Sequence, residues 1–279
     1  MSGIDAFRYD GKRVLVVGGA SGMGAAAAKT VVELGGEVIV LDYAPVEFEV
    51  KESIQVDLRD KAAVDAALDQ VGGPIHAVFS AAGVADGTPG LMKINFIAHR
   101  HIAERLVNEG TIGKGGAICF ISSAAGLGWE TESESIGSLL ATPDFESAVT
   151  WIEQEENVFR DNYMYSKQVM NTYVARQAFP FIQKGVRINA ICPGPTDTPL
   201  ARANEDLWLG FGQDWRDATG TTFGQPEEMG DTMAFLNSDA ARGISGVTLI
   251  IDGGYLMSSL AGSYEPGTGV AQFLFGKLG

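Results

Sequence analysis

The most constraining feature of the sequence is a glycine-rich turn between an apolar segment and an alanine-rich segment near the N-terminus. Residues 13–17 are apolar and β-branched, which predicts a buried strand, and residues 25–34 predict a helix that ends at Gly35 and Gly36. Glycines in the intervening residues 18–24 allow a tight turn and a close approach of the backbone to a ligand. The N-terminus of the next helix attracts phosphate. The segment predicts a pyrophosphate-binding strand–turn–helix unit, and the alternative is a tight turn that only packs against a sheet.

Short β-branched segments alternate with helical segments along the chain. We expect strands at residues 13–17, 37–41, 53–56, 76–80, 116–121, 187–192 and 247–251, and further helices at 61–71, 91–108, 161–183 and 226–237. This alternation is typical of a parallel sheet that is covered on both faces. It predicts an α/β Rossmann fold, in which a doubly wound, parallel, seven-stranded sheet has helices on both faces.

The length of 279 residues fits one large α/β domain, so we expect residues 1–279 to form a single domain. Two long segments interrupt the alternation. Residues 124–160 are an insertion before the helix at 161–183, and residues 199–224 carry Leu207, Trp208, Leu209, Phe211 and Trp215. We expect residues 199–224 to form a lid over a bulky apolar ligand, and the alternative is ordinary packing on the core. The glycine-rich residues 255–279 predict either a flexible end or an arm that reaches another subunit.

Charge and residue types exclude several classes of function. The formal net charge is −15, with 35 acidic and 20 basic residues, so nucleic acid is an unsuitable partner. No apolar segment is long enough to cross a membrane, and we expect a cytoplasmic protein in which Cys119 and Cys192 are buried thiols. The three histidines, His76, His99 and His101, show no metal-binding spacing, so we expect packing roles for them and no metal site.

An acidic residue ends the second predicted strand, where the sequence reads Leu41-Asp42-Tyr43. A carboxylate at this place accepts hydrogen bonds from the ribose hydroxyls of an adenosine and repels a 2′-phosphate. Residues 42–50 include no Arg or Lys to receive such a phosphate. The sequence therefore predicts NAD as the cofactor in preference to NADP, with Asp57 and Leu58 contacting the adenine. The alternative role for Asp42 is to cap the following turn.

Tyr163 and Lys167 lie four residues apart at the start of a predicted helix, so they share one face of it. A free tyrosine has a pKa near ~10, and a neighbouring ammonium favours the phenolate and lowers that pKa. Ser123 ends another predicted strand, at the sheet edge where open α/β folds bind ligands. Its hydroxyl is placed to hold a substrate oxygen, while no histidine is placed to make it a nucleophile.

Across residues 11–255 these features resemble the short-chain dehydrogenase/reductase family. The Thr-Gly-x-x-x-Gly-x-Gly pattern of that family corresponds to residues 17–24, and its Asn-Ala-Gly motif to residues 81–83. Its active-site asparagine corresponds to Asn95, its strand-end serine to Ser123, and its Tyr-x-x-x-Lys motif to Tyr163 and Lys167. The later Pro-Gly-x-x-x-Thr and Asp-Gly-Gly motifs correspond to residues 193–198 and 252–254.

The resemblance implies a role for each matched residue. Tyr163 would be the general acid/base, Ser123 would fix the substrate oxygen, Lys167 would lower the pKa of Tyr163 and bind ribose, and Asn95 would hold a water that relays protons. The cofactor would be contacted by Gly18, Ser21, Gly22, Met23, Gly24, Asp42, Tyr43, Asp57, Leu58, Ala81, Ala82, Gly83, Tyr163, Lys167, Ile191, Pro193, Gly194, Thr196 and Thr198. The expected partners are a small-molecule alcohol or ketone and further copies of the chain in a dimer or tetramer, paired through residues 161–183.

Three departures from the family pattern narrow the interpretation. Val17 and Ala81 replace a threonine and an asparagine whose side chains have structural roles, and 40 positions separate Ser123 from Tyr163, far more than in most of the family. The long insertion resembles the branch of 3α-hydroxysteroid and coniferyl-alcohol dehydrogenases. It is expected either to wall the substrate pocket or to cover a surface used for subunit pairing, with its many acids on a solvated exterior.

The sequence therefore predicts an NAD-dependent oxidoreductase that interconverts a secondary alcohol and a ketone on a bulky, hydroxysteroid-like substrate. One alternative is a dehydrogenase of an aromatic or terpenoid alcohol. Another is a related chemistry on the same fold, such as enoyl reduction or epimerisation. An alternative of a different class is a catalytically silent NAD-binding regulator, which would have no use for the complete set of Asn95, Ser123, Tyr163 and Lys167.

Overall fold

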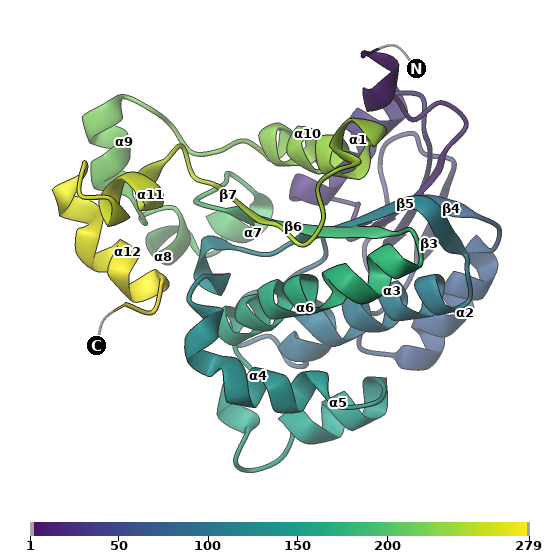
Figure 1. The fold of residues 1–279 in the computed structure, drawn as a ribbon, viewed down its shortest axis with the longest axis horizontal. Coiled ribbons are helices and arrows are strands. Elements are labelled where there is room, and N and C mark those ends of the chain that lie inside the picture. Colours follow the sequence, from purple (N-terminus) through teal and green to yellow (C-terminus); the bar gives the residue numbers. More distant parts are fainter. Residues whose placement is uncertain (1–2, 278–279) are drawn as a thin grey trace.

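Seven parallel strands form one sheet in the order β3-β2-β1-β4-β5-β6-β7 (Figure 1). The computed structural model describes residues 3–277, together with their side chains except those of residues 206 and 207. The strands are β1 (Arg13–Val17), β2 (Glu37–Asp42), β3 (Glu52–Gln55), β4 (Ile75–Ser80), β5 (Ile112–Ile121), β6 (Arg187–Pro193) and β7 (Thr248–Ile251). Each lies at a segment predicted from the sequence. The expected single-domain Rossmann fold is confirmed.

Two helices cover one face of the sheet, α1 (Gly22–Glu33) and α10 (Pro226–Asn237). They pack at close range, because a Cβ atom on Gly230 of α10 would lie only 2.7 Å from the backbone nitrogen of Ala27 in α1. Apolar side chains of β1, β2 and β4 fill the space between this helix pair and the sheet. Strands buried in this way read as continuous apolar runs, which is why the sequence showed them clearly.

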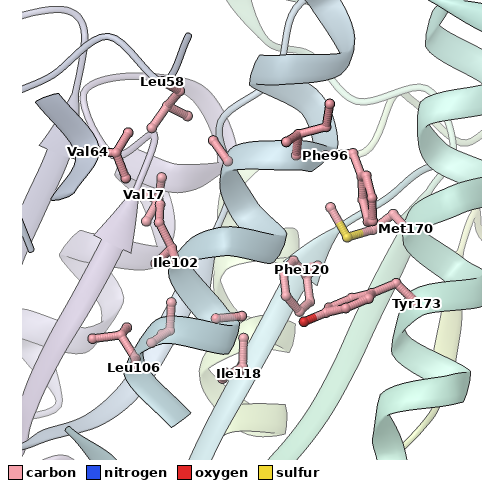
Figure 2. Close-up of a cluster of buried hydrophobic side chains, with 14 of the residues drawn as sticks. Val17, Leu58, Val64, Phe96, Ile102, Leu106, Ile118, Phe120, Met170 and Tyr173 are labelled. Carbon is pink, nitrogen blue, oxygen red and sulfur yellow. The ribbon is translucent and has the colours of Figure 1, made fainter. Parts of the chain in front are cut away.

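The opposite face is covered by α2 (Lys61–Val71), α3 (Ala98–Asn108) and α6 (Tyr163–Gln183). Figure 2 shows part of this core, where the rings of Phe96 and Phe120 meet Tyr173 edge to face at 5.7 and 6.0 Å between ring centroids. The sequence predicted one continuous helix over residues 91–108. The structure instead has a π-helical turn, Lys93–Ile97, immediately before α3. Such turns occur mostly at functional sites, and this one contains Asn95.

The chain reverses direction across the sheet between β1 and β4. It passes from β1 outward through β2 to β3 and then returns to β4 on the other side of β1. The backbone nitrogens of Ala81 and Ala82, just after β4, both donate to the carbonyl oxygen of Val17 at 2.7 and 2.9 Å. Open α/β sheets bind ligands at the carboxyl ends of strands beside such a reversal. The glycine-rich turn after β1 lies at this point.

The insertion forms two short helices, α4 (Ser133–Leu140) and α5 (Phe145–Ile152), on the outer side of α6 and α3 (Figure 1). Its apolar residues, including Ile136, Leu139 and Phe145, join the core on that side. The Arg100 guanidinium of α3 donates to the carbonyl oxygen of Thr142 at 2.7 Å, which fixes the link between the two helices. Neither α4 nor α5 lines the cavity that contains Tyr163, so these helices cover the flank of the domain instead.

The remaining helices gather over the carboxyl edge of the sheet. They are α7 (Pro199–Arg202), α8 (Glu205–Trp208), α9 (Gln213–Thr219), α11 (Tyr255–Leu260) and α12 (Thr268–Leu274). Short 3₁₀ turns lie at Asp5–Phe7, Ala124–Gly126, Trp129–Glu132, Val158–Arg160, Asp239–Ala241 and Glu265–Gly267. Aromatic rings of Trp215, Tyr255 and Tyr264 join α9 to the C-terminal helices. Residues 255–277 therefore fold back onto their own chain. No helix among residues 3–277 combines the length and apolar character required to cross a bilayer.

Candidate active site

The glycine-rich turn opens onto a cavity of about 400 Å³ at the carboxyl ends of β1, β2 and β4, which we name the turn cavity. Most of the residues predicted to contact a dinucleotide line it, namely Gly18, Ser21, Gly22, Met23, Gly24, Asp42, Tyr43, Asp57, Leu58, Ala81, Ala82, Gly83 and Thr198. Helix α1 begins at Gly22, so its unpaired N–H groups lie at the wall of this cavity. The arrangement has the features of an anion-binding helix N-terminus.

Glycine is required in this turn by close backbone contacts. Gly18 has a φ of +82°, and a Cβ atom there would lie 2.3 Å from the backbone nitrogen of Ala82. A Cβ atom on Gly83 would lie within 4 Å of both the Asn95 Oδ1 atom and the Lys167 Nζ atom. These are ordinary contact distances, so they place Gly83 next to Asn95 and Lys167 without requiring glycine there. Gly83 lines both the turn cavity and the cavity that contains Tyr163 and Lys167.

Asp42 has the capping role that was weighed as the alternative to contact with a ribose. Its Oδ2 atom accepts from the backbone nitrogen of Ala20 at 2.8 Å, and its Oδ1 atom accepts from that of Ala44 at 2.9 Å. The carboxylate thus caps the turn after β2 and ties the glycine-rich turn to it. It also lines the turn cavity. The two hydrogen bonds hold the carboxylate at the cavity wall. Each of its oxygens can still accept a second hydrogen bond.

One basic residue of the turn cavity was missed by the sequence analysis. Arg59 lines the cavity, beyond residues 42–50 in which a phosphate-binding base was sought. Its guanidinium binds the Asp57 carboxylate, with 2.6 Å between Nη2 and Oδ2, and this bond lowers the pKa of Asp57. The position directly after Asp57 and Leu58 was the signal that could have found it.

A second cavity, of about 650 Å³, contains the predicted catalytic side chains and is named the tyrosine cavity. Ser123, Tyr163 and Lys167 line it together with Pro193, Gly194, Thr196 and Thr198. It shares Met23, Ala81, Gly83, Thr198 and Leu200 with the turn cavity. The two cavities therefore adjoin, and a ligand in the turn cavity can extend toward Tyr163.

Two predicted residues lie outside both cavities. Ile191 is fully buried in β6 and packs in the core on the α1 side of the sheet, so its side chain does not line the turn cavity as expected. Asn95 is also fully buried. Its Oδ1 atom accepts from the backbone nitrogen of Val84 at 2.8 Å, and its Nδ2 atom donates to the Val84 carbonyl and to Ser166 Oγ. The Asn95 side chain thus holds the segment after β4 against α6.

Helix α6 positions Tyr163 and Lys167 through bonds at its N-terminus. The Asn162 side chain accepts from the backbone nitrogen of Tyr165 at 2.9 Å, as a typical N-cap residue does. Asp86, from the loop after β4, accepts from the backbone nitrogen of Tyr163 at 2.6 Å. The sequence gave no indication of this contact, because 77 positions separate the two residues.

The ionisation of the pair differs from the expectation. Burial raises the pKa of Tyr163 to about 12, while hydrogen bonding with Ser123 acts to lower it. Burial also lowers the pKa of Lys167 to about 8. The Lys167 Nζ atom lies 5.4 Å from the centroid of the Tyr163 ring and donates to the carbonyl oxygen of Ile121 at 2.9 Å. In the ligand-free chain, burial thus outweighs the lowering of the Tyr163 pKa that a neighbouring ammonium was predicted to cause.

The segment 199–224 and helix α12 contribute further walls of the tyrosine cavity. Four described residues of the segment 199–224 line the cavity, namely Leu200, Ala201, Trp208 and Phe211. Helix α12 adds Gly269, Val270, Phe273 and Leu274, which sequence reasoning did not identify because the tail has a weak pattern. The walls are mainly apolar. Of the apolar residues predicted to form a lid, Trp208 and Phe211 line this cavity, whose size suits a bulky apolar ligand. Leu209 and Trp215 do not line it, and Trp215 packs against Tyr255 and Tyr264 instead.

Histidines and cysteines lie apart from this chemistry. His99 is buried and contacts Ser80 Oγ and the carbonyl oxygen of Ala82, and burial lowers its pKa to about 4. His76 and His101 bond to the backbone of Arg13 and to Asp65. Cys119 and Cys192 are both buried free thiols, as predicted. Within the described part of the chain, no group of three or more histidine, cysteine or acidic side chains is arranged to hold a metal ion.

Comparison with known proteins gives consistent results. A family model described as enoyl-(acyl carrier protein) reductase matches residues 18–256. The chain is 27% identical over 249 residues to a coniferyl-alcohol dehydrogenase of Pseudomonas sp., covering 87% of this chain and 96% of that protein. It is 28% identical over 264 residues to cis-4-hydroxycyclohexanecarboxylate dehydrogenase of Sinomonas cyclohexanicum, covering 88% of this chain and 96% of that protein.

A solved structure shows the same architecture. The 3-alpha-hydroxysteroid dehydrogenase from Pseudomonas sp., determined in complex with NADH, superposes with a TM-score of 0.72 at 25% sequence identity. The match covers 90% of this chain and 99% of that chain. With the glycine-rich turn and the Ser123, Tyr163 and Lys167 side chains lining adjoining cavities, the family match over most of the chain identifies this protein as a member of the short-chain dehydrogenase/reductase family of NAD(P)-dependent oxidoreductases.

Proposed function

We propose that the chain is an NAD-dependent dehydrogenase that interconverts a secondary alcohol and a ketone on a bulky, largely apolar, hydroxysteroid-like compound. The observation that carries the proposal is the placement of Ser123, Tyr163 and Lys167 in one apolar-walled cavity that adjoins the turn cavity. A hydroxyl group, an acid/base group and a cation converge there on the place where a carbinol would lie.

Each side chain has a distinct task in this reaction. Tyr163 takes the proton from the alcohol during oxidation and returns it during reduction, and Ser123 holds the substrate oxygen by a hydrogen bond. Lys167, whose ammonium is held at the carbonyl oxygen of Ile121, stabilises the phenolate and binds the ribose near the nicotinamide. The bound dinucleotide supplies hydride transfer, and the protein orients it. Asn95 and Asp86 keep the surrounding segments in place.

The preference for NAD rests on Asp42. Its carboxylate lines the turn cavity and is fixed by two backbone N–H groups. A 2′-phosphate at that wall would meet a negative charge that cannot turn away. Arg59 is the nearby base, but it is already paired with Asp57. We therefore assign NAD and not NADP as the cofactor.

The substrate class rests on the walls of the tyrosine cavity. Trp208, Phe211, Val270, Phe273 and Leu274 offer an apolar surface that suits a fused-ring or other bulky alcohol. The names of the relatives include dehydrogenases of a 3-alpha-hydroxysteroid, of coniferyl alcohol and of cis-4-hydroxycyclohexanecarboxylate. All three compounds combine a hydroxyl group with a ring-containing carbon skeleton. An aromatic or terpenoid alcohol is the alternative substrate.

The matching family model is described as enoyl-(acyl carrier protein) reductase, so enoyl reduction is the second candidate reaction. Enoyl reduction adds hydride and a proton across a carbon–carbon double bond. It does not require a hydroxyl such as that of Ser123 to hold a carbinol oxygen beside the general acid. The set of Ser123, Tyr163 and Lys167 therefore favours carbonyl–alcohol exchange. A silent NAD-binding regulator is disfavoured for the same reason, because binding alone uses neither Ser123 nor Tyr163.

We also propose that the chain forms homo-oligomers through α6. The last turns of this helix expose Phe179 and Ile182, with exposed fractions of 69% and 46%. Helix α4 packs against α6, so a subunit contact would involve the surface of its last turns that carries Phe179 and Ile182. Light scattering of the parent chain and of a Phe179→Glu variant tests this contact, and an equal mass for both would contradict it.

The central experiment follows the reduction of NAD and of NADP by absorbance, with panels of hydroxysteroids, terpenoid alcohols and aromatic alcohols. We expect turnover with NAD on hydroxysteroids. A parallel assay with an enoyl thioester and NADH tests the second candidate. Reduction of the thioester without turnover of any alcohol would overturn the proposal, and binding of NAD without turnover of either kind would favour the regulator.

A further inference from the structure

A third cavity, of about 290 Å³, lies beside the tyrosine cavity and is named the side cavity. It is formed by the end of the insertion, the first turns of α6 and the C-terminal segment. Ala125, Met164, Phe273 and Leu274 line both this cavity and the tyrosine cavity. The two cavities are therefore neighbours across a thin wall of mainly apolar side chains.

The geometry of α6 places the two cavities on different sides of one helix. Tyr163 and Lys167, one turn apart, line the tyrosine cavity, whereas Tyr165 and Gln168 line the side cavity. Met164 lies between these directions and lines both. The two cavities therefore meet at Met164 on α6.

Two residues that line the side cavity each carry a buried polar atom without a hydrogen-bond partner among the described residues. The Tyr165 hydroxyl and the Arg160 Nε atom are buried and have no hydrogen-bond partner within the described residues. Tyr165 is only 4% exposed. A buried donor without a partner destabilises the fold. Arg160 Nε is a donor only, so the group that satisfies it must be an acceptor.

The guanidinium of Arg160 forms no ion pair with the acidic side chains that the structure describes. The whole chain has 35 acidic and only 20 basic residues. The guanidinium lies over the ring of Phe159, 4.3 Å from its centroid, and its Nη1 atom donates to the Glu156 carbonyl and to Asn157 Oδ1. A partly buried cation held in this way suits a carboxylate ligand.

We infer that the side cavity binds a carboxylate at the far end of the substrate, through Arg160 and Tyr165. The inference rests on the proposed function, and it narrows the substrate to a bulky apolar alcohol that also carries an acid. The carbinol lies at Ser123 and Tyr163, the apolar body lies along Met164 and Phe273, which line both cavities, and the acid lies at Arg160. At the other end, the tyrosine cavity carries the Asp86 carboxylate, which repels an acid placed there.

Glu132 opposes this binding and supplies a sharp test. It also lines the side cavity, where its Oε2 atom accepts from Ser135 Oγ at 3.1 Å. Its negative charge weakens the binding of a carboxylate, so Glu132→Gln and Arg160→Met should act in opposite directions. Removal of the Tyr165 hydroxyl in Tyr165→Phe should weaken binding less than removal of the guanidinium, because only one neutral donor is lost.

The experiment compares a 3α-hydroxysteroid whose side chain ends in a carboxylate with its methyl ester, using the full chain and NAD. We expect Arg160→Met to raise the KM of the acid relative to the ester by about tenfold or more, as loss of a charge-assisted hydrogen bond predicts. Glu132→Gln should lower the same ratio severalfold. Arg242→Met, which changes an exposed arginine outside all of these cavities, is the matched control. An unchanged ratio in both cavity variants would overturn the inference.

Calorimetry separates failure of the site from failure of the proposed function. The two steroids are titrated into the chain saturated with NADH, and the ratio of their Kd values is measured in each variant. If neither compound is turned over but Arg160→Met weakens the acid selectively, the proposed reaction fails and the side cavity stands. If the acid does not bind, or binds no more weakly in Arg160→Met, the side cavity fails whatever the turnover.

Discussion

The indole ring of Trp208 lies against the phenol ring of Tyr163, with 4.7 Å between the ring centroids and 42° between the ring planes. Trp208 comes from α8 in the lid, whereas Tyr163 is the first residue of α6. The contact places a lid side chain directly on the proposed general acid/base. It therefore excludes water from the phenol, and burial is the largest cause of the raised pKa of Tyr163.

Removal of the Trp208 ring should lower the pKa of Tyr163. In Trp208→Ala, water reaches the phenol, and its pKa should fall from about 12 toward the ordinary value of 10.0. The pH profile of kcat/KM for alcohol oxidation should shift to lower pH in the same direction. Trp208→Phe keeps a ring in place and should retain the parent profile. Identical profiles for the alanine variant and the parent would show that the stacked ring does not control this ionisation.

Loss of the Tyr163 hydroxyl should abolish proton transfer while the cofactor site remains. Tyr163→Phe should reduce kcat by about a thousandfold, within the range of a removed general acid/base, and change the Kd of NAD by less than about twofold. Tyr173→Phe is a suitable control, because the Tyr173 hydroxyl lies in the core and has no partner within the described residues. Steady-state kinetics measures kcat, and quenching of the protein's tryptophan fluorescence during titration with NAD measures the Kd. Full activity of Tyr163→Phe would refute the assigned mechanism.

Cofactor preference should follow the charge of Asp42 and not its hydrogen bonds. Asp42→Asn keeps an oxygen that accepts from one of the two backbone N–H groups, but it removes the negative charge. We expect the ratio of kcat/KM for NAD over NADP to fall at least about tenfold, since a like charge facing a phosphate costs several kcal/mol. The ratio is measured with one alcohol and both cofactors. Equal use of NAD and NADP by the parent chain would already contradict the role of Asp42.

Lys167 should make the stability of the ligand-free chain depend on pH. Its pKa is lowered from 10.5 to about 8 in the folded state, so the unfolded state binds the proton more tightly and the buried ammonium destabilises the fold. This cost is fully present below pH 8 and is lost as the pH rises toward 10.5. Between pH 7 and pH 10 the parent should therefore gain about 2 kcal/mol of unfolding free energy relative to Lys167→Met.

Urea unfolding of both chains at each pH measures this difference. Other titrating groups are shared by the two chains and cancel in the comparison. A difference that does not change with pH would mean that Lys167 keeps its ordinary pKa in the folded chain. The same variant should lose activity, because the methionine cannot stabilise the Tyr163 phenolate.

The strands, the glycine-rich turn and the proposed catalytic residues were accessible from the sequence because their signals are local. Buried strands of a parallel sheet are continuous apolar runs, and the motifs around Gly18, Ser123 and Tyr163 occupy fixed places relative to strand ends. A helix period likewise places Tyr163 and Lys167 on one face. These features depend on neighbouring residues, so the chain order alone determines them.

Only the tertiary structure decided what surrounds those residues. The contact of Asp86 with Tyr163, the position of Arg59 in the turn cavity and the α12 wall of the tyrosine cavity all join segments far apart in the chain. Tertiary packing also decided the ionisation of Tyr163, since burial there outweighs the effect of Lys167 that spacing suggested. Periodicity and motifs indicate on which face of its helix or strand a side chain lies. Long-range packing determines the solvent, the charges and the cavity walls around that face, and no local pattern contains this information.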